Sequence, residues 1–505
     1  MGNIKKFILF LLFIYLTGNI SSYCSTQNNP DSLNKIGISS DTSGISNDTK
    51  QSISVIPNIN KKSNLLPVKS DSKFNLLVLL KGLLGMFVLI GIAFIFSDNR
   101  KAISWRIVGI GLGIQVILAF GILHVSYIQS IFEFVGKCFV KVIDFTNEGT
   151  AFLFKSYSSG IIESPLQNFA FTILPTIIFF SALTSVLFYF GIIQKIVWFM
   201  GWILTRLLKL SGAEGLAAAA NIFLGQVEAP LLIKAYLEKM NRSEILLIMS
   251  AGMATLAGGV LAVYINFLGG DDPVQRILFS KHLLAASVMA APGVVVISKI
   301  LVPQTEKIDK DVEVSEQKIG KNVLDAINKG TIEGLKLAVY VAAMLLVFLA
   351  FLAMINFVLI KIGAWTNINA WVTDISSGRF QNLSLQFILG YALSPLMWLL
   401  GINIHDITLV GSLLGEKLVM TEFVGYIHLS EMKNANLFTD PKSIIMATYI
   451  LCGFANFASV GMQIGGIGAL APGKRLLLAK LGMRALLAGT LASLLSATII
   501  GIILS

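Results

Sequence analysis

The sequence predicts an all-α polytopic membrane protein with about eight transmembrane helices, two opposed re-entrant hairpins, inverted repeats and helices broken near the bilayer midplane. Three observations support this fold class. Of the 505 residues, 55% are hydrophobic and 13% charged, and the mean hydropathy is +0.77, unlike a soluble domain. Several apolar runs of roughly 20 residues can cross a hydrocarbon core of about 30 Å. None of these runs shows the alternating pattern of outer-membrane barrel strands.

The N-terminal residues are predicted to lie outside the membrane domain. Two lysines precede ten apolar residues, Phe7 to Leu16, which would cover only about 15 Å as a helix. This pattern favours a signal peptide over residues 1–24. Residues 25–73 are rich in Ser, Asn, Asp and Lys, which is typical of a disordered polar linker. The membrane domain is therefore expected to span residues 74–505.

The apolar runs can be threaded alternately across a bilayer from an external start. Beyond the N-terminal tail, cytoplasmic Lys and Arg then outnumber external ones by about two to one, as the positive-inside rule requires, and both termini are expected to be periplasmic. This topology accounts for the net charge of +11 without a nucleic-acid partner. The mixed segment 128–168 is expected at the interface, 303–336 in the cytoplasm and 361–404 outside. The predicted spans are 75–96, 107–127, 169–192, 244–268, 281–302, 337–360, 443–471 and 482–503.

Two segments, 212–237 and 405–428, are too polar to be spans, and each must return to the side from which it entered. We therefore predict two re-entrant hairpins. Each is followed by a hydrophobic span interrupted by small residues, "MATLAGGVLAVY" and "CGFANFASVGMQIGGIGALAP". Corresponding interrupted segments in two inverted halves indicate the binding site of a secondary transporter, since irregular backbone at membrane depth has to line a cavity.

Two glutamates are the leading functional candidates, because an ionised carboxylate at membrane depth costs at least a few kcal/mol. Glu228 and Glu422 both lie among apolar residues in the hairpins. The alternative is purely structural: Glu228 would pair with Lys234, and Glu422 with Lys417.

The amides near these glutamates favour a neutral solute or a cation over an anion. Gln226 and Asn221 offer both donors and acceptors. Asn456 and Ser459 lie three residues apart and share a helix face. The alternatives are that Asn221 and Asn456 cap helices and that Ser459 is a packing residue. Apart from the hairpin mouths, no Lys or Arg lies in the hairpin tips or the broken spans, which indicates a solute that is uncharged overall.

Several stretches, in this order, resemble the concentrative nucleoside transporters. These stretches cover nearly the whole chain after residue 74, with weaker similarity in "WRIVGIGLGIQ" and "NEGTAFLF". The resemblance implies eight spanning helices, two opposed hairpins, a homotrimer in a bacterial inner membrane, a scaffold of about 74–200 and 321–382, and a transport part of about 201–302 and 383–505. The matching stretches are "FAFTILPTIIFFSALTSVLFYFGIIQKIV", "AAANIFLGQVEAPLLIKAYL", "MATLAGGVLAVYI", "GSLLGEKLVMTEFVGYI" and "CGFANFASVGMQIGGIGALAP".

The same resemblance assigns roles to residues of the hairpins and broken spans. The nucleobase would be held by Gln226, Val227, Glu228 and Val260. The ribose would be held by Glu422, Asn456 and Ser459, with Phe454 packing close by.

Family members are driven by sodium or by protons. Sodium-coupled members bind the ion between the first hairpin and the first broken span. The matching ligands in this sequence would be oxygen atoms of Asn221, Leu224, Thr255 and Leu256, which are hard donors. Both side-chain ligands are present, which favours sodium as the coupling ion, while a proton carried by a glutamate stays open.

Two positions depart from the family pattern. Val227 stands where many relatives have Ser or Thr, which leaves the choice between purines and pyrimidines open. Thr421 stands where the usual "NEF" has Asn.

Enzymatic activity and transport of a different solute are the alternative functions. An enzyme would need a nucleophile or a metal, but Cys24, Cys138 and Cys452 have no paired spacing and the four His no ligand pattern, so no cofactor is expected. A symporter of another neutral polar solute, such as a nucleobase, stays open.

Overall fold

Every regular element in the described part of the chain is a helix, as the predicted fold class requires. The computed structural model describes residues 76–156, 162–163, 168–309, 320–376 and 378–504. Apart from Glu163, these residues belong to one compact unit. The predicted signal peptide and the polar linker lie outside the described residues.

Six of the eight predicted spans coincide with helices, or with helices in line, that are long and apolar enough to cross a membrane. The other two correspond to the apolar helix α2 and to the pair α18 and α19. The number of actual crossings stays a prediction.

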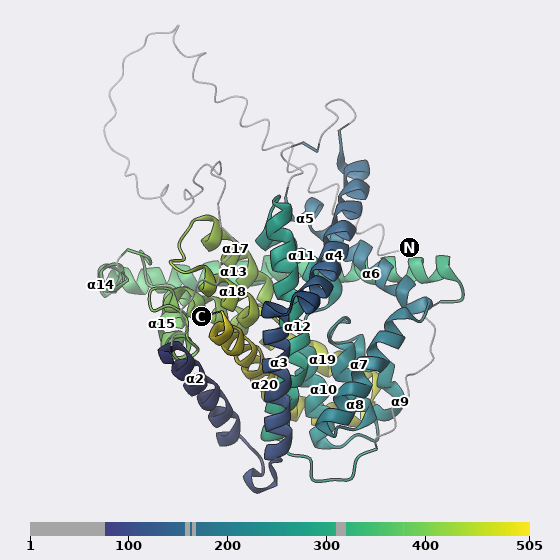
Figure 1. Ribbon diagram of the computed structural model, residues 1–505. Coiled ribbons are helices and arrows are strands. Elements are labelled where there is room, and N and C mark those ends of the chain that lie inside the picture. Colours follow the sequence, from purple (N-terminus) through teal and green to yellow (C-terminus); the bar gives the residue numbers. More distant parts are fainter. Residues whose placement is uncertain (1–75, 157–161, 164–167, 310–319, 377, 505) are drawn as a thin grey trace, which may run out of the picture. The chain divides into compact units, whose positions relative to one another are not determined.

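The helices from α2 to α7 precede the first hairpin in the chain (Figure 1). Residues 128–154 of the segment predicted at the interface belong to α4, a helix of 29 residues with polar and apolar residues interspersed, and part of the remainder lies outside the described residues. Two residues with left-handed backbone, Gly191 and Lys209, bound α7 and turn the chain sharply. The helices in this part are α2 (Leu76–Ile95), η2 (Arg100–Ala102), α3 (Trp105–His124), α4 (Ser126–Phe154), α5 (Phe169–Thr172), α6 (Leu174–Tyr189) and α7 (Ile192–Leu208).

The first predicted hairpin consists of α8 (Gly212–Ala220), a loop, η4 (Ala229–Ile233) and α9 (Lys234–Leu237). A capping box fixes the start of α8: the Ser211 side chain accepts from the Glu214 amide, and Glu214 accepts from the Ser211 amide. Such a box satisfies two helix donors that have no partner within the helix. Pro230 is the second residue of the short return helix, since proline fits the first helical turn. The polar residues from Asn221 to Glu228 thereby occupy the loop.

The first interrupted span breaks where the sequence predicted. α10 (Arg242–Ala254) ends at Thr255, which has extended backbone, and α11 (Gly258–Gly269) begins after Ala257. The α12 helix (Pro273–Leu301) then packs against both pieces.

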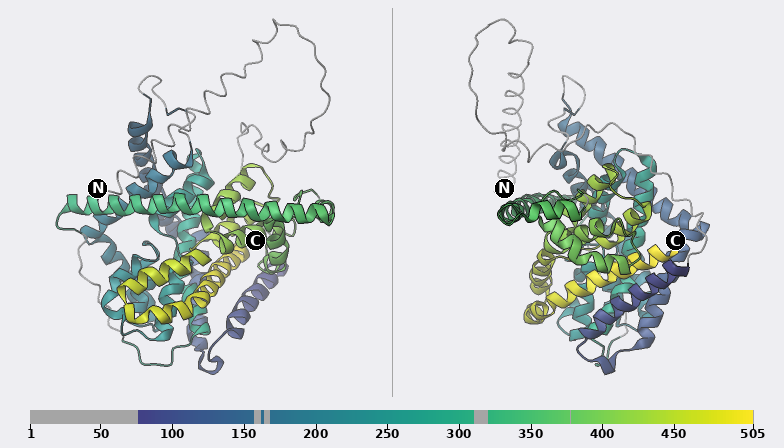
Figure 2. Two further views of the ribbon diagram at one scale, coloured as in Figure 1. Left: turned by 180° about the vertical axis from the view of Figure 1, so that it is seen from behind. Right: turned by 90° about the vertical axis from the view of Figure 1, so that its left-hand side faces the viewer.

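The α13 helix (Val323–Trp365) has 43 residues and is longer than the predicted span 337–360. It begins at Val323 because Asn322 caps it by accepting from the Asp325 amide. The sequence predicts residues 303–336 to be a charged cytoplasmic connection. Residues 323–336 of this segment instead form the start of α13. In Figure 2, α13 is the long green helix that runs across the others.

The segment 361–404 contains α14 (Ile368–Ile375) and α15 (Leu385–Leu399). The sequence pattern predicts only an external location for this segment. The α15 helix packs along α16, and two glycines make that approach possible. A Cβ on Gly411 would lie 2.7 Å from the Gly390 carbonyl oxygen, and one on Gly390 would lie 2.8 Å from that of Thr408. The second hairpin is thus held against a helix that the sequence pattern did not reveal.

The second hairpin consists of α16 (Ile407–Val419) and α17 (Glu422–Asn434), which contact each other across the tip Met420–Thr421. The span after it is broken between α18 (Pro441–Leu451) and α19 (Phe457–Leu470), and η5 (Pro472–Lys474) leads into α20 (Arg475–Ile503). Both halves therefore repeat one order of elements: a hairpin, a broken helix and a helix of 29 residues.

The two helix breaks touch each other. Gly453 has a φ of +91°, and a Cβ there would lie 2.5 Å from the Met253 carbonyl oxygen. The Cys452 Sγ lies 3.9 Å from the Ala254 carbonyl oxygen. Only glycine fits this position, because both the space and the left-handed backbone exclude a side chain.

Candidate functional site

A cavity of about 160 Å³ lies where both hairpin tips meet both helix breaks. Its wall contains all eight residues that the sequence analysis assigned to substrate, and α13 closes one side. The lining residues are Gly225, Gln226, Val227, Glu228, Ala257, Val260, Leu337, Tyr340, Val341, Met344, Leu345, Thr421, Glu422, Phe423, Phe454, Asn456, Ala458, Ser459 and Met462.

Glu422 presents a buried carboxylate to this cavity; its exposed fraction is 3%. Asn456 Nδ2 donates to one carboxylate oxygen at 2.8 Å, and the Tyr264 hydroxyl donates to the other at 3.2 Å. Asn456 also caps α19, because its Oδ1 accepts from the Ser459 amide at 2.8 Å. The capping and functional alternatives for Asn456 are therefore compatible, since its two amide atoms serve different partners.

Gln226 connects the first hairpin tip to the second broken helix. Its Nε2 donates to the Ser459 Oγ at 3.2 Å, and its Oε1 accepts from the Gln463 Nε2 at 3.1 Å. Gln463 also donates to the Met249 carbonyl oxygen at 2.9 Å. The base-side and sugar-side candidates thus share one hydrogen-bonded network.

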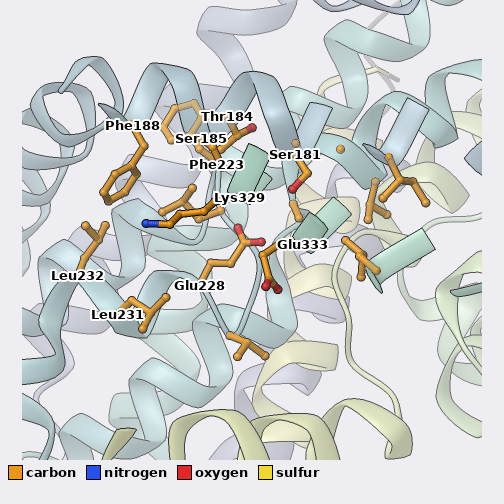
Figure 3. A pocket seen from close by; sticks show the side chains of 18 residues that line it. Ser181, Thr184, Ser185, Phe188, Phe223, Glu228, Leu231, Leu232, Lys329 and Glu333 are labelled. Carbon is orange, nitrogen blue, oxygen red and sulfur yellow. The ribbon is translucent and has the colours of Figure 1, made fainter. Parts of the chain in front are cut away.

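Val227 and Glu228 face a second, larger cavity of about 400 Å³ as well as the first. Val227 has an exposed fraction of 37%, and a Glu228 carboxylate oxygen accepts from the Gly225 amide at 3.2 Å. Figure 3 shows Glu228 and Glu333 pointing into the larger cavity, together with Lys329 and three α6 hydroxyls, those of Ser181, Thr184 and Ser185.

The two cavities adjoin, because five residues line both. These residues are Val227, Glu228, Ala257, Val260 and Leu337.

The four residues predicted to bind sodium lie in two buried segments beside the first break. Asn221 is fully buried; its Nδ2 donates to the Ala217 carbonyl oxygen at 2.9 Å, while its Oδ1 has no hydrogen-bond partner among the described residues. Thr255 Oγ1 donates to the Ala251 carbonyl oxygen at 2.9 Å, which leaves its lone pairs free to coordinate. A buried acceptor without a partner is costly, so the Asn221 oxygen fits a cation ligand.

Ser287 on α12 joins these two segments. Its Oγ accepts from the Leu256 amide at 3.4 Å and donates to the Ile222 carbonyl oxygen at 3.3 Å. The Gly258 amide donates to the Phe223 carbonyl oxygen at 3.1 Å. The loop containing Leu224 and the break containing Leu256 are therefore held next to each other.

The salt-bridge alternatives for the two glutamates do not occur among the described residues. Neither the Glu228–Lys234 nor the Glu422–Lys417 pair is within ion-pair distance. Lys417 donates instead to backbone carbonyl groups. This outcome leaves both carboxylates available to a ligand.

Three family models match successive parts of the chain. The N-terminal model of the Na⁺-dependent nucleoside transporters matches residues 84–157, the nucleoside recognition Gate model residues 170–271, and the C-terminal model of the same transporters residues 282–501. The nucleoside permease NupC of Helicobacter pylori is 38% identical over 83% of this chain and 96% of its own.

The chain belongs to the concentrative nucleoside transporter family. Other members of the family are also similar over most of the chain. An uncharacterized transporter of Haemophilus influenzae is 39% identical over 84% of this chain and 97% of its own. The sodium/nucleoside cotransporter 1 of Rattus norvegicus is 34% identical over 83% of this chain and 63% of its own. It is a family of transporters and permeases rather than enzymes.

Solved transporter structures in different states resemble the chain almost equally well. CNTnw in an inward-facing, substrate-bound state has a TM-score of 0.74 at 37% identity, covering 84% of this chain and 97% of its own. An outward-facing CNTnw variant has a TM-score of 0.73 at 36% identity, covering 85% and 98%. These two states support alternating access for the family.

Sequence reasoning missed three polar residues of the site: Tyr264, Gln463 and Ser287. Tyr264 lies four residues after Val260, and Gln463 four after Ser459, so each shares a helix face with a predicted residue. That spacing could have revealed them. Ser287 lies in an unbroken helix with no neighbouring candidate, so no comparable spacing could have revealed it.

Proposed function

We propose that this chain is a secondary active transporter that imports nucleosides together with a cation, sodium being favoured, by alternating access. The observation that carries the proposal is the cavity enclosed by two hairpin tips and two helix breaks, with two carboxylates and two side-chain amides in its wall. A site of this chemistry replaces the water shell of a neutral, hydroxyl-rich solute.

The sugar is assigned to the Glu422 side of the cavity. Ribose hydroxyls donate hydrogen bonds, and a carboxylate held by Asn456 and Tyr264 keeps lone pairs to accept them. Asn456 and Ser459 complete this side, and Phe454 packs close by.

The base is assigned to the other side of the cavity, to Gln226, Val227, Glu228 and Val260. A base edge carries both donors and acceptors, and Gln226 offers both. The Gln226 amide also binds Ser459 and Gln463, so it is oriented before the base arrives.

The sodium ion is assigned to the Asn221 and Thr255 side-chain oxygens and the backbone carbonyls of Leu224 and Leu256. The buried Asn221 oxygen without a partner supports this assignment. Ions and nucleosides would then bind at adjoining segments of the first hairpin and the first broken helix, which favours their joint movement.

The larger cavity is assigned as the route to the cytoplasm, because its residues come from the ends of α6 and α13 that the threading puts inside. This assignment depends on periplasmic termini. We also propose a homotrimer in the bacterial inner membrane. The α13 helix exposes large apolar side chains, including Leu346 and Phe357, and a partner subunit would cover some of them.

Uptake of labelled uridine and adenosine into proteoliposomes tests the transport proposal, with imposed sodium and proton gradients compared. Sodium coupling predicts uptake that follows the sodium gradient. Uptake that follows only the proton gradient would select the proton-coupled alternative. The absence of gradient-driven uptake of any nucleoside would refute the function.

Competition between uridine and uracil addresses the nucleobase alternative. Uridine should compete far better, because uracil lacks the sugar that contacts Glu422 and Asn456. Equal competition by uracil would favour a nucleobase symporter.

A further inference from the structure

The second helix break contains a buried cation that belongs to the protein itself. Lys417 on α16 is fully buried. Its Nζ donates to the carbonyl oxygens of Ile450 and Cys452, each at 2.9 Å. The α18 helix ends at Leu451. Carbonyl groups at a helix C-terminus lack partners within the helix and carry partial negative charge, so the ammonium lies where a cation is most stabilising.

The carbonyl oxygen of Cys452 is a shared acceptor at this point. The Ser493 hydroxyl of α20 also donates to it, at 2.8 Å. The ammonium is thus surrounded by main-chain carbonyl oxygens, the ligands that coordinate an alkali cation at a helix break.

The first helix break has the corresponding elements but neutral partners. In the described residues, no Lys or Arg donates a hydrogen bond to the carbonyl groups of residues 251–257. The polar side chains there are Asn221, with a buried oxygen that has no partner, Thr255 and Ser287. One break therefore presents oxygens that can accept a cation, and the other is already occupied by an ammonium group.

We infer that Lys417 is a built-in cation that fills, in the second half of the protein, the position taken by the coupling ion in the first half. A single sodium ion then accompanies each nucleoside, because the second position needs none. The inference rests on the proposed sodium coupling. It goes further by explaining the number of ions from the charge of one side chain.

Equilibrium binding of ²²Na⁺ to the purified protein, with bound ions counted per protomer, tests this inference directly. The wild type should bind one sodium ion per protomer. Lys417→Ser removes the ammonium and leaves a small hydroxyl oxygen, so this variant should bind a second ion at high sodium. Lys417→Met fills the space without charge or oxygen and should bind only one.

Nucleoside uptake provides the second readout. Nucleoside uptake by both variants should fall about tenfold or more at moderate sodium, since each substitution removes two hydrogen bonds from a charged group to the second break. High sodium should restore nucleoside uptake by Lys417→Ser, and this uptake should depend more steeply on the sodium concentration than that of the wild type. Uptake by Lys417→Met should stay impaired at high sodium.

Lys433 offers a matched control on the same hairpin. It is also buried, and its Nζ donates to the Leu268 carbonyl oxygen near the end of α11, away from both breaks. Lys433→Met should reduce thermal stability without changing the number of sodium ions bound.

The inference fails if the wild type binds two sodium ions per protomer, a result that does not require any variant to fold. It also fails if Lys417→Ser, shown to be folded by its nucleoside binding, takes up no additional ion, or if Lys417→Met transports like the wild type. A wild type whose nucleoside uptake does not depend on sodium would instead overturn the proposed sodium coupling, on which the inference rests.

Discussion

Replacing Glu422 with glutamine should severely impair uptake while the fold and assembly stay intact. Glutamine has the same shape, but one of its two head-group atoms is a donor. That donor has to face either Asn456 or Tyr264, which both donate to Glu422. The Tyr264 hydroxyl can turn and accept, whereas the Asn456 amide is fixed by its cap on α19. The substitution should therefore remove the acceptor on the Tyr264 side.

The magnitude follows from the hydrogen bonds that a ribose would lose. A hydrogen bond to a carboxylate contributes about 1.5–3 kcal/mol. The glutamine variant would lose one such hydrogen bond, and the acceptor of a second bond would lose its charge. The resulting loss of about 2–4 kcal/mol in ribose binding corresponds to a 30- to 1,000-fold decrease in Vmax/KM. Tyr264→Phe keeps the carboxylate and should cost about tenfold at most.

A double-mutant cycle with labelled uridine and 3′-deoxyuridine measures this contribution. The wild type should discriminate strongly against the deoxy compound, and Glu422→Gln should discriminate weakly. Elution on size-exclusion chromatography checks assembly. The ribose assignment is wrong if Glu422→Gln transports uridine within about twofold of the wild type, or if both proteins show the same penalty for the missing hydroxyl.

Three further substitutions test other parts of the site. Asn221→Leu should raise the sodium concentration for half-maximal uptake about tenfold or more by removing a ligand oxygen, and unchanged sodium dependence would contradict the ion assignment. Val227→Thr should shift the base preference toward pyrimidines, whereas an unaltered profile would mean that this side chain does not face the base. Lys299→Met should lower the unfolding free energy by about 3–5 kcal/mol, since it leaves the buried Glu214 carboxylate without its ammonium partner; a thermal unfolding curve like that of the wild type would exclude this role.

The hairpins and the breaks could be predicted from the sequence because hydrophilic residues are rare and costly in an apolar chain. Glu228 and Glu422 stand out for that reason. The breaks were recognisable because small residues and glycines interrupt otherwise continuous apolar spans. The structure groups all eight predicted substrate residues around one cavity.

Other features depend on packing that apolar periodicity does not encode. Hydropathy could not separate the first turns of α13 from a charged connection, since these turns carry Lys329 and Glu333. The α15 helix was missed because its contact with α16 relies on two glycines far apart in the chain. Ser287 was missed because its partners, Ile222 and Leu256, come from distant segments.

The contact of Gly453 with the backbone of Met253 and Ala254 has a mechanical consequence. Each unwound point rests directly on the other, without a compressible side chain between them. A displacement at the proposed cation site would therefore be passed to the proposed sugar site through main-chain atoms. The ion and the nucleoside would then move together with this rigid contact. The methyl group of a Gly453→Ala variant would be enough to separate the two breaks.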